Sequence, residues 1–393
     1  MMKTPLSCLL RGAALAALLA AGSAHAVQDC DIAGQSVNPN NGNTTAGKTG
    51  LMRCKDRDTG VIQREQELQN GKFMGLVRHY ENGKLQKEHS VNEQGNRHGR
   101  AREFAADGTV LVDTQYDNGS TVGIDKRFHA NGKLRRATFY DGSNSEKASA
   151  EYNAQGQLFQ LRCTDRPVLS PVVDDARLCG FNGLARLEMF DERGALYART
   201  QYLNGERVRF EQLYSSGKTQ ILQEVSATRR LDQQFSQDGV KRREEERTLD
   251  GKRIVAMRLQ QFSETGTLVK DQRWQEGRLT VETSFYLNGQ PKSKIEYTRD
   301  AAGGANDRAP VQILETEYRD DGKLAATGRY LETGRRRVAT GTHQVFNPAG
   351  RVVAESVYDA KGRISREKSW DDAGTLLRDD AVFEDGSRKA FAR

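Results

Sequence analysis

The chain has 393 residues, of which 36% are hydrophobic and 29% charged, and its formal net charge is +7. The hydrophobic share lies below that of ordinary globular chains, so a thick two-layer core is hard to build. Its 60 Lys plus Arg and 53 Asp plus Glu are evenly mixed. Without a concentrated basic stripe, the composition does not indicate a nucleic-acid partner.

The first 26 residues have the organisation of a secretory signal peptide. Basic residues precede the apolar run 12–21, and the segment ends in Ala24-His25-Ala26, an Ala-x-Ala cleavage signature. A run of about ten apolar residues is too short to cross a bilayer, and no later stretch approaches the length of a membrane span. We therefore expect export to the periplasm without a transmembrane segment, and a mature chain that begins near Val27.

Four cysteines follow the signal peptide: Cys30, Cys54, Cys163 and Cys179. Disulfides persist in an exported chain. Of the three possible pairings, Cys30 with Cys54 and Cys163 with Cys179 fits best, because each pair brackets a segment that precedes or interrupts the repeats described next. The alternative, a zinc site, is weaker, since the spacings contain no Cys-x-x-Cys and no paired histidine. We expect neither a metal nor a cofactor.

A short repeat begins near residue 61. An aromatic residue is followed three or four positions later by a glycine and then by an aliphatic residue, as in Phe128-His-Ala-Asn-Gly132-Lys-Leu134. Near the end of the chain the glycines at 350, 362, 374 and 386 are spaced by 12. A unit of this length is too short for two helices, and its Asn-Gly and Asp-Gly turns are typical of β-hairpins.

These features predict an all-β fold, namely an elongated antiparallel array of β-hairpin repeats with no substantial helix after the signal peptide. Each hairpin would be stabilised mainly by its neighbours. The charged stretch 238–247 is the one place where a helix stays open. Breaks in the period divide the chain into a disulfide-capped N-terminal segment, a repeat block, an insertion with a candidate disulfide, a second block, a Gly/Ala-rich linker and a third block: 27–60, 61–160, 161–183, 184–298, 299–311 and 312–393.

The pattern Tyr/Phe-x-x-Asn-Gly-Lys-Leu resembles the MORN-repeat variant of bacterial proteins labelled YwqK-type antitoxins. The similarity covers most of residues 60–390. Exported members of this class resemble immunity proteins that accompany antibacterial lipase or phospholipase effectors of type VI secretion systems. The resemblance therefore implies a periplasmic immunity protein that binds a cognate toxin and occludes its active site.

Motifs for catalysis are missing from the sequence. It contains neither a Gly-x-Ser-x-Gly elbow nor a P-loop, so we expect no enzymatic activity. Paired aspartates occur at turn entries, where aspartate is favoured for local hydrogen bonding. Calcium binding at these turns and glycan or ester hydrolysis by dispersed carboxylates remain the weaker alternatives.

Two groups of arginines are candidates for binding a partner. Arg335, Arg336 and Arg337 are adjacent and follow a turn glycine, so their guanidinium groups could dock a carboxylate or phosphate surface. Because insertions in repeat arrays often lie on the binding face, the interruption at 161–183 adds Arg162, Arg166 and Arg177.

Two alternatives remain open. The interruptions could merely join the repeat blocks. The protein could also be an envelope scaffold that holds lipid, peptidoglycan or another protein, with weak contact to a membrane surface.

Overall fold

The computed structural model describes residues 28–299 and 309–392. The predicted signal peptide and most of the predicted linker 299–311 lie outside these residues. The described chain is almost entirely antiparallel β-strand, with two helices of four residues each. The prediction of an all-β hairpin array without substantial helix is therefore confirmed. The chain divides into two compact units, residues 1–121 and 122–393.

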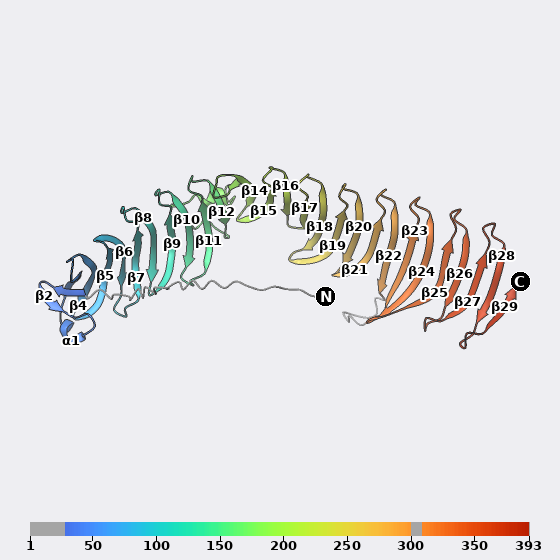
Figure 1. Ribbon diagram of the computed structural model, residues 1–393, viewed down its shortest axis with the longest axis horizontal. Helices are drawn as coiled ribbons and strands as arrows, with labels where there is room; N and C mark the ends of the chain where they lie inside the picture. Colours follow the sequence, from blue (N-terminus) through green and yellow to red (C-terminus); the bar gives the residue numbers. More distant parts are fainter. Residues whose placement is uncertain (1–27, 300–308, 393) are drawn as a thin grey trace, which may run out of the picture. The chain divides into compact units, whose positions relative to one another are not determined.

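The strands of the first unit pair antiparallel with their neighbours (Figure 1). Their order is β2-β1-β3-β4-β5-β6-β7-β8. The short helix α1 (Gly42–Thr45) follows β2. The strands are β1 (Gln28–Ile32), β2 (Gln35–Val37), β3 (Gly50–Asp56), β4 (Ile62–Gln69), β5 (Lys72–Glu81), β6 (Lys84–Val91), β7 (Arg97–Phe104) and β8 (Val110–Asp117).

In the second unit four strands pair in chain order. They are β9 (Ser120–Phe128), which begins at the boundary between the units, β10 (Leu134–Asp141), β11 (Glu146–Tyr152) and β12 (Leu158–Arg162). The helix α2 (Asp175–Leu178) leads from them to a sheet of 17 strands, β13 to β29, also paired in chain order (Figure 1).

The sheet of 17 strands begins with β13 (Ala185–Phe190), β14 (Leu196–Leu203), β15 (Glu206–Leu213), β16 (Thr219–Val225), β17 (Arg229–Phe235), β18 (Lys241–Asp250), β19 (Arg253–Phe262) and β20 (Leu268–Gln275). It continues with β21 (Arg278–Phe285), β22 (Pro291–Arg299), β23 (Val311–Tyr318), β24 (Leu324–Thr333), β25 (Arg336–Phe346), β26 (Val352–Tyr358), β27 (Ile364–Trp370), β28 (Leu376–Val382) and β29 (Arg388–Ala392). Because β22 pairs with β23, the predicted second and third blocks contribute to one sheet.

Each repeat motif forms one hairpin. Phe262, the repeat aromatic, lies across the ladder from Leu268, the repeat aliphatic, and the register shifts by one residue at Phe262. The turn closes where Gly266 donates its N–H to the Ser263 carbonyl at 3.1 Å. Gly266 has a φ of 86°, a left-handed conformation that glycine adopts without strain. The same pairing of aromatic and aliphatic recurs along the sheet, as Tyr318 with Leu324, Phe346 with Val352, Tyr358 with Ile364 and Trp370 with Leu376.

The stretch 238–247 forms most of β18 instead of a helix. Its charges suit a strand because alternate residues share a face. Glu245 accepts hydrogen bonds or ion pairs from both Arg243 and Arg247, two positions away on either side. The sequence left a helix possible at this stretch, and the structure has a strand there instead.

Opposite charges on neighbouring strands also hold the first unit together. Arg53, Glu65, Arg78, Glu88 and Arg102 lie opposite one another on β3 to β7. Their ion pairs run from Arg53 to Glu65 at 3.1 Å, from Arg78 to both Glu65 and Glu88 at 3.4 Å, and from Arg102 to Glu88. Cross-strand pairs of this kind explain how strands with few apolar residues form a stable sheet.

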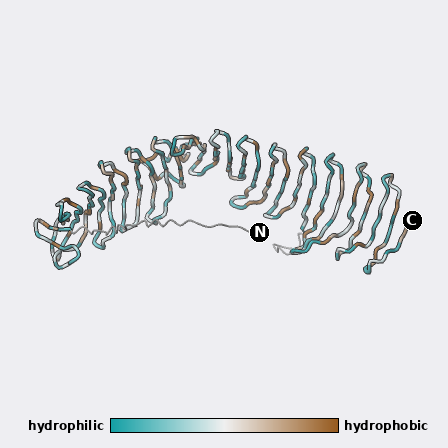
Figure 2. The backbone as a smooth tube through the Cα atoms, in the orientation of Figure 1, coloured by the Kyte–Doolittle hydropathy of each residue, from teal (hydrophilic) through white to brown (hydrophobic). Residues whose placement is uncertain are grey.

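Most of the 17-stranded sheet is a single layer. In β16, β21 and β26 every residue is partly exposed, whichever face it lies on. Figure 2 shows hydrophilic and hydrophobic residues interspersed along these strands. The larger of the two hydrophobic clusters lies in the second unit, around α2. Leu169 is fully buried there, and Val173, Met189 and Tyr202 belong to the same cluster.

Candidate partner-binding surfaces

The structure separates the three adjacent arginines that the sequence singled out. Arg337 lies on β25, and its guanidinium carbon is 4.0 Å from the centre of the Tyr330 ring. Its Nη2 is 2.5 Å from Glu315 Oε2. Arg335 lies in the turn between β24 and β25, Arg336 begins β25, and both are exposed. Arg335 and Arg336 make no ion pair with any described residue, so they are the two available to a partner.

An aromatic cluster adjoins Arg337. The ring of His343 lies between Tyr330 and Tyr358, with ring centres 5.0 Å and 4.5 Å away. Burial raises the pKa of Tyr330, and nearby Glu315 adds to this effect. The cluster gives this part of the sheet flat aromatic faces beside cationic groups, a combination that is enriched in protein interfaces.

The position of His343 depends on a glycine. The imidazole Nε2 lies 2.8 Å from the Arg329 carbonyl oxygen and 3.1 Å from its nitrogen. A Cβ at Gly328 would lie 3.0 Å from His343 Nδ1. The sequence gives little sign of this arrangement, because it depends on an irregular pairing of β24 with β25. The pair of Thr327 with Gln344 is followed by the pair of Arg329 with Thr340, so β25 has two more residues than β24 in this interval.

The insertion 161–183 has an apolar interior. Leu169 and Cys179 are buried, and the Asp175 carboxylate, itself 2% exposed, accepts the backbone N–H groups of Val168 at 2.6 Å and Leu169 at 2.8 Å. The Tyr202 hydroxyl from β14 donates to the Leu161 carbonyl at 3.1 Å. The insertion is thus a packed connector between β12 and β13, besides any role in binding.

The three arginines of the insertion point away from this interior. Arg162, Arg166 and Arg177 are all exposed. Arg177 Nε lies 3.6 Å from Asp174 Oδ2, whereas Arg162 and Arg166 form no ion pair with the described residues. The predicted candidates at this insertion are therefore surface groups on a rigid base, and their role in binding stays a prediction.

Two disulfides are present, and both join the cysteines closest in sequence. Cys30 and Cys54 are direct neighbours on β1 and β3, with Cα atoms 4.0 Å apart. Cys163 and Cys179 close the insertion, with Cα atoms 5.8 Å apart. Each bridge lies in one of the two hydrophobic clusters.

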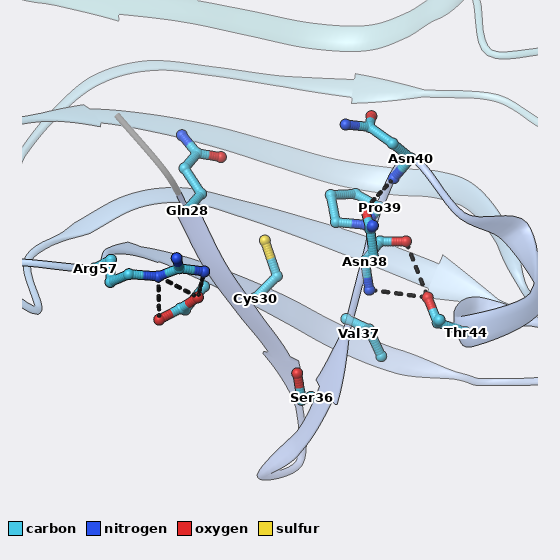
Figure 3. Close-up of a pocket in the computed structure, with 10 residues that line it drawn as sticks. Gln28, Cys30, Ser36, Val37, Asn38, Pro39, Asn40, Thr44 and Arg57 are labelled. Carbon is cyan, nitrogen blue, oxygen red and sulfur yellow. Dashed lines mark hydrogen bonds and ion pairs between the residues drawn. The ribbon is translucent and has the colours of Figure 1, made fainter. Parts of the chain in front are cut away.

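A cavity of about 550 Å³ lies beside the first disulfide (Figure 3). Its lining is mostly uncharged and polar, with Asn38, Asn40 and Thr44 on one side and Arg57 on the other. Arg57 donates to Asp29 from Nε at 3.1 Å and from Nη2 at 2.8 Å, and this hydrogen bonding lowers the Asp29 pKa. The amide and hydroxyl groups of the lining can exchange hydrogen bonds with a polar ligand. The two charged residues that line the cavity, Asp29 and Arg57, already bind each other.

His79 on β5 and His89 on β6 are two histidines whose rings are neighbours. Their rings stack with centres 6.0 Å apart. Burial lowers the His79 pKa, and the positive charges of Arg64, Lys87 and Arg97 lower it further. Cationic neighbours oppose the binding of a metal ion. Within residues 28–299 and 309–392, no three His, Cys, Asp or Glu side chains gather as a metal site would require.

No helix among the described residues is long and apolar enough to span a membrane. The fold and these surfaces define a protein of β-hairpin repeats with exposed arginine and aromatic groups. Residues 280–298, on β21 and β22, match the model of the MORN repeat variant. This match supports the predicted repeat class. A search of curated proteins found no match.

Similarity to solved structures is distant. A TcdB2–TccC3 complex without its hypervariable C-terminal region is 14% identical over 87% of this chain and 22% of the other, with a TM-score of 0.12. The Photorhabdus luminescens Tc holotoxin pore is 12% identical over 85% of this chain and 24% of the other, again with a TM-score of 0.12. A putative 6-phosphogluconolactonase from Bacteroides uniformis is 13% identical over 88% and 91%, also with 0.12. The chain spans less than a quarter of the length of the two toxin chains.

Proposed function

We propose that this chain is a periplasmic immunity protein without enzymatic activity. It binds a cognate secreted antibacterial effector, a lipase or phospholipase of a type VI secretion system, and covers the active site of that effector. The observation that carries the proposal is the single-layer sheet of 17 strands, in which both faces stay partly exposed over many strands. A surface of this kind suits contact with a folded protein.

The exposed groups support a protein as the partner. Arginine and aromatic side chains carry much of the binding energy in protein interfaces. Arg335 and Arg336 are exposed, make no ion pair within the described chain, and lie at the β24–β25 turn, next in sequence to Arg337, which contacts Tyr330. The MORN-variant match at residues 280–298 agrees with a repeat-type binding role, and the two disulfides are consistent with export.

Inhibition of the effector encoded beside the gene tests the proposal. Lipid hydrolysis by this effector is measured with increasing amounts of the signal-free, disulfide-formed chain. We expect inhibition to be complete at a stoichiometric amount. The variant Arg335→Ala/Arg336→Ala is expected to weaken it, and Arg193→Ala, an exposed arginine in a turn of the second unit, serves as the control. Full hydrolysis in the presence of excess wild-type chain contradicts the proposal.

An envelope scaffold that contacts lipid is the second candidate. It is favoured by the large apolar side chains at the last strands, where Leu377, Phe383 and Phe391 are 61%, 51% and 60% exposed. Arg388 and Lys389 lie in the same segment. Co-sedimentation with anionic vesicles distinguishes this function, because binding through basic residues weakens as salt rises. Absence of binding at low salt removes it.

A further inference from the structure

Strands β15 to β18 surround a second cavity, of about 370 Å³. Three arginines line it, Arg207 from β15, Arg230 from β17 and Arg247 from β18. Phe210 and Leu231 contribute apolar surface. All of these residues belong to the second unit, and none is among the candidates that the sequence predicted.

Two of these arginines lie directly opposite each other on neighbouring strands. Arg230 and Arg247 are direct partners in the register of β17 with β18. Like charges in directly opposite positions destabilise an antiparallel pair. An anion between the two guanidinium groups would convert this repulsion into attraction.

The charges nearby show which of the arginines are available. Arg247 is already paired with Glu245. Arg207 stacks on Phe210, with its guanidinium carbon 4.6 Å from the ring centre. Neither Arg207 nor Arg230 makes an ion pair within the part of the chain that the structure describes, and both are exposed.

The adjacent arginines on the same strands behave differently. Arg209 pairs with Glu224 at 2.8 Å, and Arg229 pairs with Glu246. The sheet therefore provides carboxylates for the neighbouring arginines but not for Arg207 and Arg230. This contrast singles out the cavity from the evenly paired surface around it.

Acidic residues limit the size of the basic area. Glu224 and Asp232 line the same cavity. Asp232 accepts a hydrogen bond from Gln223 at 2.8 Å and Glu224 pairs with Arg209, and within the described residues neither makes an ion pair with Arg207 or Arg230. A nucleic-acid backbone needs a continuous basic track and would meet these carboxylates. One or two carboxylates on a polypeptide fit the area better.

We propose that the cavity around Arg207, Arg230 and Phe210 binds an acidic segment of the protein partner. This inference rests on the proposed function, since it specifies which chemistry the partner presents. A glutamate or aspartate of that segment would accept paired hydrogen bonds from a guanidinium group, and its chain would pack on Phe210 and Leu231. Lysine cannot replace arginine in such paired bonding.

Fluorescence anisotropy with the full signal-free chain tests this assignment. The probe is a short fluorescein-labelled peptide of alternating glutamate and glycine, and the same peptide with glutamine in place of glutamate is the negative probe. The variant Arg207→Ala/Arg230→Ala should bind the acidic probe at least about tenfold more weakly than wild type. Arg230→Lys, which keeps the charge, should also bind it more weakly.

A matched control separates this site from general charge effects. Arg135→Ala/Arg193→Ala removes two exposed arginines of the second unit that make no ion pair with described residues. It should bind the probe as wild type does. Circular dichroism and thermal melting of each variant establish that it is folded. Equal probe affinity of Arg207→Ala/Arg230→Ala and wild type overturns the inference.

Inorganic phosphate as a competitor checks the chemistry of the ligand. If phosphate displaces the probe at concentrations comparable to those of the probe, the cavity is a phosphate site and the assignment is wrong. If phosphate displaces the probe only at high ionic strength, the result agrees with the assignment to an acidic peptide segment. The peptide experiment does not use the effector, so an effector that fails to bind would remove the proposed function while leaving the peptide result unchanged.

Discussion

Arg258 on β19 holds Asp271 on β20 in a paired arrangement, with Nε donating to Oδ1 at 2.8 Å and Nη2 donating to Oδ2 at 3.2 Å. The aspartate is only 4% exposed. The same two-bond pairing, at the same separation of 13 residues, joins Arg100 to Asp113 and Arg366 to Asp379. Each pair connects the two strands of one hairpin, so it fixes the hairpin's register in the absence of a thick core.

Loss of one such aspartate should destabilise the sheet. Asp271→Ala leaves Arg258 without its partner, and we expect the free energy of unfolding to fall by about 1–2 kcal/mol, because Arg258 stays partly solvated. Urea unfolding measures the change. Asp238→Ala, an exposed aspartate in a turn, is the control and should change little. Equal stability of both variants would show that the pair contributes nothing.

The second disulfide should matter for the stability of the second unit. Cys163 and Cys179 are 16 residues apart in sequence and belong to its main hydrophobic cluster. Loop-closure entropy predicts a loss of roughly 3 kcal/mol for Cys163→Ala/Cys179→Ala. Thermal melting of this variant, compared with the disulfide-formed wild type, measures the effect. An unchanged melting temperature would contradict it.

Stability of the first unit should depend on pH through His89. Burial lowers the His89 pKa to about 4, and the charges of Arg97, His79 and Arg64 add to the effect. The unfolded chain binds a proton near the ordinary value of 6.5, which the folded chain resists. This contribution therefore destabilises the fold progressively as pH falls from about 6.5 to about 4, and it is absent above this range.

Urea unfolding at several pH values tests the role of His89. His89→Gln should show a weaker loss of stability between pH 6.5 and 4 than wild type does. His98→Gln, which changes an exposed histidine of β7, is the control. If both variants follow the wild-type pH profile, His89 does not cause the dependence.

Gly328 should be coupled to His343. An alanine Cβ at position 328 would lie 3.0 Å and 3.1 Å from two imidazole atoms, so Gly328→Ala must displace the ring. We expect a loss of about 1–3 kcal/mol in unfolding free energy. The variant Gly328→Ala/His343→Ala should lose less than the sum of the single changes. Strict additivity would show that the ring is not the obstacle.

The three adjacent arginines should divide into two roles. Arg337→Ala removes the contacts with Tyr330 and Glu315 and should lower the melting temperature. Arg335→Ala/Arg336→Ala should leave the melting temperature unchanged but weaken partner binding. Calorimetric titration with the partner and thermal melting measure both effects. A melting temperature lowered equally by both variants would contradict this division.

The sequence predicted the hairpins because each repeat carries its own turn and its own cross-strand pair, such as Phe262 with Leu268. The insertion was harder to interpret, since Leu169 and Val173 lie outside the repeat and their burial depends on packing against β13 and β14. The sequence alone does not decide between helix and strand for β18, because sign-mixed charges occur on both.

The candidate site was only partly predictable. The adjacency of Arg335 to Arg337 is visible in the sequence, but the Arg230 and Arg247 pair requires the register of β17 with β18. The sequence does contain a signal for the three paired arginines and aspartates. Arg258, Phe262, Gly266 and Asp271 have the same spacing as Arg100, Phe104, Gly108 and Asp113 and as Arg366, Trp370, Gly374 and Asp379. This spacing marks the three paired arginines and aspartates.

The most direct test is to mix the signal-free, disulfide-formed chain with the effector encoded beside its gene and to measure the mass of the product by size-exclusion chromatography with light scattering. We expect a stoichiometric complex in which the lipase activity of the effector is lost. Separate elution of the two proteins with full lipase activity would contradict it.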